Sequence, residues 1–174
     1  RHLPKIWLMT DPRLADDLCC AVRRLPAGSG VVFRHYHLPE PDRRKLFLKI
    51  RAICRRRGHK LLLAGTERSA VNWGADGMHS RMGGNRRLRS APVHTTREIA
   101  EAKRNGAVLL FLSPVFATRS HPGARALGMM RFNQLAHSAQ PASVIALGGM
   151  SRARSMMLDK RLVHGWAAID AFTS

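Results

Sequence analysis

The chain has 174 residues, is 45% hydrophobic and carries a formal net charge of +19. This length predicts one globular domain over residues 1–174, and the lack of an export signal or of an apolar run of ~18 residues predicts a cytoplasmic protein with no membrane partner. The charge raises nucleic acid as a partner. However, the arginines are spread over most segments without stacking aromatics or a recognition motif, so we keep nonspecific nucleic-acid binding only as a distant alternative.

Short apolar runs alternate with longer amphipathic stretches along the chain. The apolar runs predict strands at 6–10, 31–33, 61–63, 78–79, 91–94, 108–112, 144–147 and 166–169. Helical spacing and capping residues predict helices at 14–25, 41–57, 67–73, 97–105, 131–138 and 151–160. The pattern is poorest over 80–93.

Eight strands with intervening helices favour a closed α/β barrel, the (β/α)8 TIM barrel, over an open doubly wound sheet. Such barrels usually need about 200 residues or more. The chain therefore has to form a minimal barrel with a shortened fourth unit.

The run 108–112 predicts a strand buried on both faces, and Pro114 ends its ladder pairing. The loop that follows carries hydroxyl and basic side chains: Thr118, Arg119, Ser120 and His121. A buried strand that opens into a loop of anion-binding side chains is how α/β proteins build a site at the C-terminal edge of the sheet. An ordinary basic loop is the alternative.

Other candidate site residues follow the remaining strands: Asp11, Arg34, His79, His94, Gly148, Gly149 and Asp170. The two glycines precede a predicted helix, so their amides and the helix dipole could hold a phosphate, although the same pair also suits a plain tight turn. Three histidines, His79, His94 and His121, could supply acid/base chemistry near neutral pH. A single histidine is more often a structural hydrogen-bonding residue.

Five segments together resemble the thiamine phosphate synthase family, which also contains a thiazole tautomerase. They are 7–12, 74–79, 94–98, 113–118 and 144–150. The resemblance implies a (β/α)8 transferase of thiamin biosynthesis that joins a pyrimidine pyrophosphate to a thiazole phosphate with Mg²⁺. It places the phosphate or pyrophosphate contacts at Arg34, Thr118, Ser120, Gly148 and Gly149, and the catalytic positions at His94 and His121. Asp11, His79, Arg119 and Asp170 are further contributors to the rim.

The chain departs from the synthase pattern where that family holds its metal. Ala64 and Gly65 stand where the synthases read Asn-Asp, and the position of another metal-binding Asp falls near Gly83 and Gly84. Mg²⁺ needs hard oxygen ligands, so we expect no metal and no cofactor. Asp170 replaces a phosphate-contacting serine and would repel a phosphate unless a basic side chain neutralises it.

Three functions stay open on the sequence. The first is an enzyme of thiamin metabolism that binds a small phosphorylated heterocycle, either synthase-like with degenerate Mg²⁺ and pyrophosphate ligands or tautomerase-like. The tautomerase branch also lacks the carboxylates and uses a histidine at the position of His94, and one positioned imidazole can suffice to move a proton. The second is a repurposed, non-catalytic barrel that binds a small anion, and the third is the nucleic-acid binder. A homodimer is compatible with each.

Overall fold

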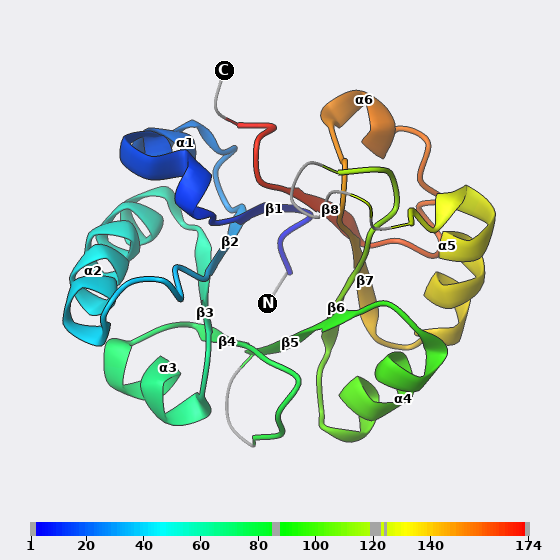
Figure 1. Cartoon of the computed structure of the whole chain (residues 1–174), viewed down its shortest axis with the longest axis horizontal. Coiled ribbons are helices and arrows are strands. Elements are labelled where there is room, and N and C mark those ends of the chain that lie inside the picture. The colour runs from blue at the N-terminus through cyan, green and yellow to red at the C-terminus, as the bar shows by residue number, and fades with distance from the viewer. Residues whose placement is uncertain (1–2, 85–87, 119–122, 124, 173–174) are drawn as a thin grey trace.

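In the computed structural model, which describes residues 3–84, 88–118, 123 and 125–172, eight parallel strands close into a barrel in chain order (Figure 1). The strands are β1 (Ile6–Met9), β2 (Gly30–Phe33), β3 (Lys60–Ala64), β4 (Gly77–His79), β5 (Leu88–Val93), β6 (Leu109–Leu112), β7 (Ser143–Ala146) and β8 (Gly165–Ala168). The last strand pairs with the first, as in the register Trp7 to Ala167. The minimal (β/α)8 barrel predicted from the sequence is confirmed.

The helices surround the barrel on its outside (Figure 1). They are a 3-10 turn η1 (Pro12–Asp17), α1 (Leu18–Arg24), α2 (Glu40–Arg57), α3 (Glu67–Trp73), α4 (Thr96–Arg104), α5 (Gly128–Ser138) and α6 (Arg152–Ser155). Among the residues that the structure describes, no helix combines the length and the apolar character that crossing a bilayer requires.

Two helix predictions need correction. The helix predicted at 151–160 ends at Ser155, because α6 buries none of its residues and so lacks the packing that would extend it. The helix predicted at 14–25 is divided into η1 and α1, and Asp17, at the junction, makes no side-chain cap.

Strand β5 begins at Leu88, three residues before the predicted start at 91. Its first half carries polar residues that are nevertheless buried. The Arg89 guanidinium donates to the carbonyls of Met82 and Gly84, and the Ser90 hydroxyl contacts His79. These partners inside the fold satisfy the Arg89 Nη groups and the Ser90 hydroxyl, although Arg89 Nε is buried without a partner among the described residues. A strand with such a polar sequence is hard to recognise from the sequence alone.

Large side chains fill the barrel interior where glycines leave room for them. The Trp7 and Phe111 rings meet edge to face at 5.5 Å between centroids. Gly30, the register partner of Trp7 on β2, lies against the indole, and a Cβ at that position would overlap it. The barrel thus alternates large and small residues across facing positions.

Gly77→Ala is expected to lower the free energy of unfolding by about 2–3 kcal/mol, because a Cβ there would overlap the Leu88 carbonyl oxygen and lie 2.8 Å from Leu62 Cδ2. Chemical denaturation measures the change. Gly83→Ala is the matched control, since its Cβ would meet nothing nearer than 3.9 Å. Equal stability of the two variants would contradict the close approach of β4 and β5.

Candidate functional site

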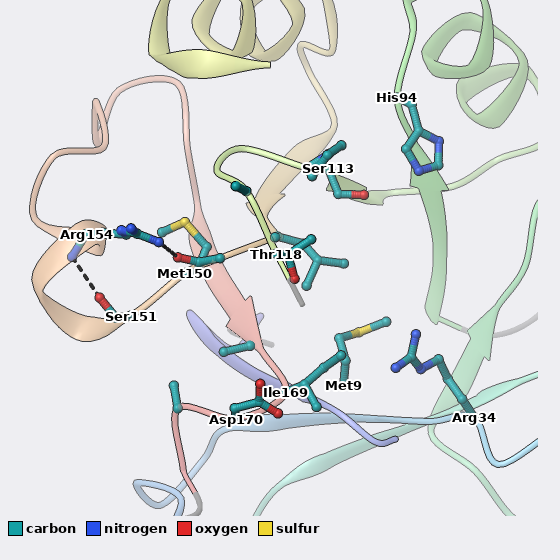
Figure 2. A pocket seen from close by; sticks show the side chains of 17 residues that line it. Met9, Arg34, His94, Ser113, Thr118, Met150, Ser151, Arg154, Ile169 and Asp170 are labelled. Carbon is teal, nitrogen blue, oxygen red and sulfur yellow. Dashed lines mark hydrogen bonds between the residues drawn. The ribbon is translucent and has the colours of Figure 1, made fainter. Parts of the chain in front are cut away.

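One pocket of about 450 Å³ opens where the strands end at their carboxyl termini (Figure 2). Residues from separate βα units line it together. Six of them were singled out in the sequence: Arg34, His94, Thr118, Gly148, Gly149 and Asp170. The barrel therefore brings distant segments to one place, as is expected for residues at the strand ends of a closed parallel sheet.

Arg34 is fixed at the end of β2 by the first βα unit. Its Nε donates to the Thr10 carbonyl at 2.7 Å, and its Nη2 donates to Asp11 Oδ2 at 3.0 Å. Its backbone N–H donates to Thr10 Oγ1. Burial lowers the pKa of the Arg34 guanidinium, and the negative charge of Asp11 opposes that shift. The side chain is thus a held cation at the pocket wall.

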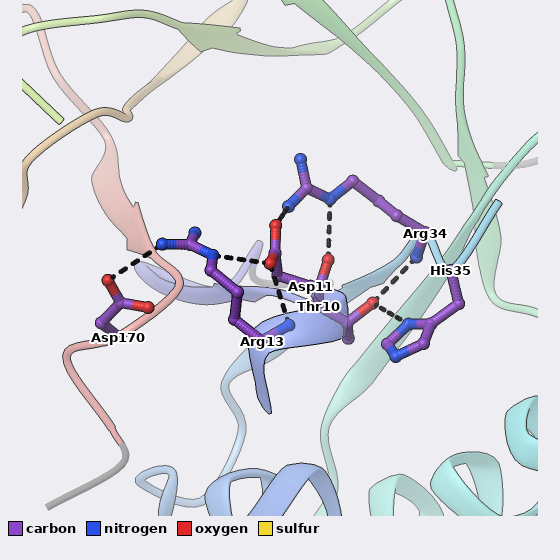
Figure 3. A network of polar contacts seen from close by, with 6 residues as sticks. All are labelled: Thr10, Asp11, Arg13, Arg34, His35 and Asp170. Atoms are coloured by element: carbon purple, nitrogen blue, oxygen red, sulfur yellow. Dashed lines mark hydrogen bonds and ion pairs between the residues drawn. The ribbon is translucent and has the colours of Figure 1, made fainter. Parts of the chain in front are cut away.

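Alternating charges continue from Arg34 to the loop after β8 (Figure 3). Asp11 also accepts from Arg13 Nε at 2.8 Å, and Arg13 Nη1 lies 3.6 Å from Asp170 Oδ2. Burial raises the pKa of Asp11, but the hydrogen bonds and charges of Arg13, with the charge of Arg34, bring it below its ordinary value. Asp170 therefore has the basic neighbour that a carboxylate in a phosphate pocket would need.

His94 follows β5 and is oriented by the start of α4. Thr95 caps the helix, its Oγ1 accepting from the Glu98 N–H, and the Glu98 side chain turns back toward His94. Glu98 Oε2 accepts from the His94 backbone N–H at 2.6 Å and lies 3.0 Å from His94 Nδ1. Arg81 Nη2 also lies 3.3 Å from Nδ1, but Glu98 is nearer. Because a carboxylate only accepts, we assign the proton of the neutral ring to Nδ1, which leaves Nε2 for the pocket.

Glu98 is itself held by Arg81, whose Nη2 lies 2.9 Å from Glu98 Oε1. Burial raises the pKa of Glu98, but the hydrogen bonds from His94 and the charges of His94 and Arg81 bring it below its ordinary value. Glu98 is therefore an anion at neutral pH. The helix cap that begins α4 also positions the imidazole.

Gly148 and Gly149 both have positive φ, +96° and +61°. A Cβ at Gly148 would lie 2.7 Å from Pro114, and one at Gly149 would lie 2.5 Å from the Ala117 carbonyl oxygen. The loops after β6 and β7 are therefore in backbone contact, which brings Thr118 to the same pocket. The prediction that a helix dipole assists the glycines needs correction, because α6 has only four residues. Backbone amides and side chains are then the groups that could hold an anion there.

The other predicted residues lie elsewhere. His79 is buried inside the barrel, with Nδ1 2.8 Å from Ser90 Oγ and its ring 5.1 Å from that of Phe111, so it does not line the pocket. Asp11 does not line the pocket, but it forms an ion pair with Arg34, which does. Arg119, Ser120 and His121 lie outside the described residues.

Several lining residues were not singled out as site residues in the sequence: Met9, Met150, Ser151 and Arg154. Ser113, a hydroxyl expected at the end of the sixth strand, also lines the pocket. Arg154 is the most informative, since it adds a second cation. On a helix over 151–160 it looked like one more dispersed arginine. Its place three residues after the cap Ser151 puts it on the first turn, beside the strand ends, and this spacing was the available signal.

The donor set of the pocket does not fit Mg²⁺. Asp170 is the carboxylate among the described lining residues, and it is ion-paired with Arg13. Glu67 approaches Gly84 but does not line the pocket. No three His, Cys, Asp or Glu residues gather into a metal-binding group within the described part of the chain. Mg²⁺ in enzymes is held by carboxylates together with substrate phosphates.

The fold and the pocket define a (β/α)8 barrel protein with a largely apolar pocket that also holds charged and hydroxyl side chains. The pocket lies at the carboxyl ends of the strands, where barrel enzymes carry their catalytic groups. The family model described as thiamine monophosphate synthase matches residues 6–172. The chain belongs to this family, as the sequence motifs indicated.

Curated relatives agree with this membership, and a solved structure shares the fold. The chain is 27% identical over 187 residues to a putative thiamine-phosphate synthase 2 of Aquifex aeolicus, covering 98% of each chain. It is also 27% identical to a thiamine-phosphate synthase of Chloroflexus aurantiacus, over 96% of this chain and 84% of the relative. The fold superimposes on the thiamine phosphate pyrophosphorylase from Pyrococcus furiosus with a TM-score of 0.79 at 23% identity, covering 96% and 86% of the two chains.

Proposed function

We propose that the pocket binds one small phosphorylated heterocycle and that His94 moves a proton on it, in an isomerisation of the thiazole tautomerase type. The observation that carries the proposal is the orientation of His94: Glu98 holds Nδ1 at 3.0 Å, which leaves Nε2 as the acceptor on the pocket side. A tautomerisation needs one group that takes a proton from one atom and returns it to another.

The proton that this reaction moves can be taken up and returned by His94 alone. Neutral His94 takes a proton from the substrate at Nε2, and the imidazolium that forms is stabilised by the Glu98 carboxylate. The same proton, or one exchanged with water, returns to a second substrate atom. No electron transfer or leaving group is involved.

The phosphate of the substrate would be held at the opposite part of the pocket from His94. The amides of Gly148 and Gly149 and the Thr118 hydroxyl are suited to an anion, and their positions at the loops after β6 and β7 support this assignment. Mg²⁺-assisted departure of pyrophosphate is a poorer match to the pocket. Asp170, the carboxylate among the described lining residues, is already paired with Arg13.

The test is an incubation with a thiazole phosphate tautomer in D2O, followed by NMR, with EDTA present. We expect protein-dependent isomerisation with deuterium incorporation. In a second assay, which contains Mg²⁺ and the two synthase substrates, we expect little formation of thiamin phosphate. Vigorous Mg²⁺-dependent synthesis would overturn the proposal.

The second candidate function is thiamin phosphate synthesis with altered ligands, which family membership and the synthase relatives favour. The same two assays separate it from isomerisation. Phosphate binding with neither activity would instead indicate a repurposed barrel that binds a small anion.

Asp170→Ser is expected to tighten binding of inorganic phosphate by about fivefold at low ionic strength, because it removes a negative charge from the pocket and one of the two carboxylates paired with Arg13. Titration calorimetry measures the change. Asp159→Ser is the control, since it breaks a carboxylate–arginine pair, with Arg161, outside the pocket. Weaker binding in Asp170→Ser would mean that this carboxylate helps to hold the ligand.

A further inference from the structure

We propose that Arg154 is the cation that recognises the phosphate of a monophosphorylated ligand in this pocket. The inference rests on the proposed function for the identity of the pocket, and it adds a specificity residue that the motifs of the chain do not indicate. Arg154 lines the pocket from α6, next to the loop that contains Gly148 and Gly149.

The Arg154 side chain is held in place although it lies at the surface. Its guanidinium sits over the Phe116 ring, 4.7 Å from the centroid, and its Nη1 donates to the Gly149 carbonyl. Its own backbone N–H donates to Ser151 Oγ at 3.2 Å. A stacked and hydrogen-bonded guanidinium loses less conformational freedom when it binds a ligand than a freely moving one would.

Gly149 is what allows this approach. A Cβ at that position would lie 3.1 Å from Arg154 Nη1 and would collide with the backbone at Ala117. The guanidinium and the glycine amides can therefore act on the same anion. Because a guanidinium carries five N–H donors in a planar fork, the bond to Gly149 leaves donors at Nε and Nη2 for two phosphate oxygens.

The two pocket arginines differ in their electrostatic state. Arg34 is ion-paired with Asp11, whereas no carboxylate of the described residues lies within ion-pair distance of Arg154. Figure 2 shows the two on opposite sides of the pocket, with Thr118 between them. An arginine that none of the described carboxylates pairs with, held beside the loop of Gly148 and Gly149, is complementary to a dianionic phosphate monoester.

Figure 2 also places His94 away from Arg154, on the other side of Thr118. A phosphate held by Arg154 would thus be remote from the atoms that exchange protons. The binding energy it supplies would be similar in the ground state and the transition state, so its loss should raise KM and leave kcat unchanged.

The experiment compares Arg154→Gln and Arg154→Lys with Arg152→Gln, which removes the same charge from an exposed neighbour on α6. Inorganic phosphate is titrated into each protein by calorimetry. We expect Arg154→Gln to weaken binding by about tenfold to a hundredfold, Arg154→Lys to restore part of the affinity because lysine lacks the fork, and Arg152→Gln to match the wild type.

Equal phosphate affinity of Arg154→Gln and Arg152→Gln would overturn the inference, as would a wild type that does not bind phosphate at millimolar concentrations. A fall in kcat with unchanged KM for Arg154→Gln would overturn it as well. The result is separable from the proposed reaction: Arg154-dependent phosphate binding without isomerisation leaves the inference standing and removes the chemistry. Isomerisation with a KM that does not depend on Arg154 would support the proposed reaction and overturn the role of Arg154.

Discussion

His94→Gln is expected to lower kcat for thiazole isomerisation by about two to four orders of magnitude while KM stays within about threefold. Glutamine approximates the shape of the imidazole but cannot take up and return a proton. The phosphate contacts proposed above do not involve this side chain, so binding should persist. Steady-state rates by NMR, together with phosphate titration, measure the two effects separately.

Glu98→Gln is expected to lower kcat by a smaller factor, about tenfold to a hundredfold, because the amide keeps a hydrogen bond but not the charge that stabilises the imidazolium. His137→Gln is the matched control, since His137 is exposed on α5 and outside the pocket. An unchanged rate in His94→Gln would remove this histidine from the mechanism, and an equal loss in His137→Gln would point to a general effect on the protein.

The parts of the fold that were predictable are those where sequence pattern and environment agree. Strand β6 is buried on both faces and is apolar throughout, and Thr95 caps α4 with Glu98 in the capping-box position. The order of eight strands followed from such local signals. Parallel pairing of consecutive strands then closes the barrel and brings Arg34, His94 and Gly149 to one pocket.

The parts that were not predictable depend on contacts between distant residues. The start of β5 was hidden because Arg89 and Ser90 are polar residues that find partners inside the fold. The approach of Arg154 to the pocket depends on its contacts with Gly149 and Phe116 in the loops after β7 and β6, which the sequence does not show. The pairing of Arg13 with Asp170 could not be predicted from the chain, because the two residues lie more than 150 positions apart in sequence.

Lowering the pH from 7.5 to 5 is expected to reduce the free energy of unfolding, mainly through two of the three buried histidines, His79 and His35. Burial lowers the pKa of His79 to about 3, assisted by the charge of Arg34. Burial likewise lowers the pKa of His35 to about 4, with His37 and Arg34 adding to the shift. Below pH 6.5 the unfolded chain takes up these protons and the native protein does not, so stability falls with pH by about 2 kcal/mol for each group at pH 5.

Urea unfolding between pH 5 and 8 tests this slope in variants that no longer titrate at one site. His79→Gln can keep the bond to Ser90, and His35→Asn suits the left-handed backbone at φ +42°. Each should remove a large part of the pH dependence, and His59, whose pKa burial also lowers, accounts for a further part. His137→Gln should keep all of it. The carboxylates Asp11 and Glu98 have lowered pKa values, so their contribution is lost only at more acidic pH. A wild-type stability that is flat from pH 7.5 to 5 would mean that both imidazoles take up protons in the folded protein as readily as in the unfolded chain.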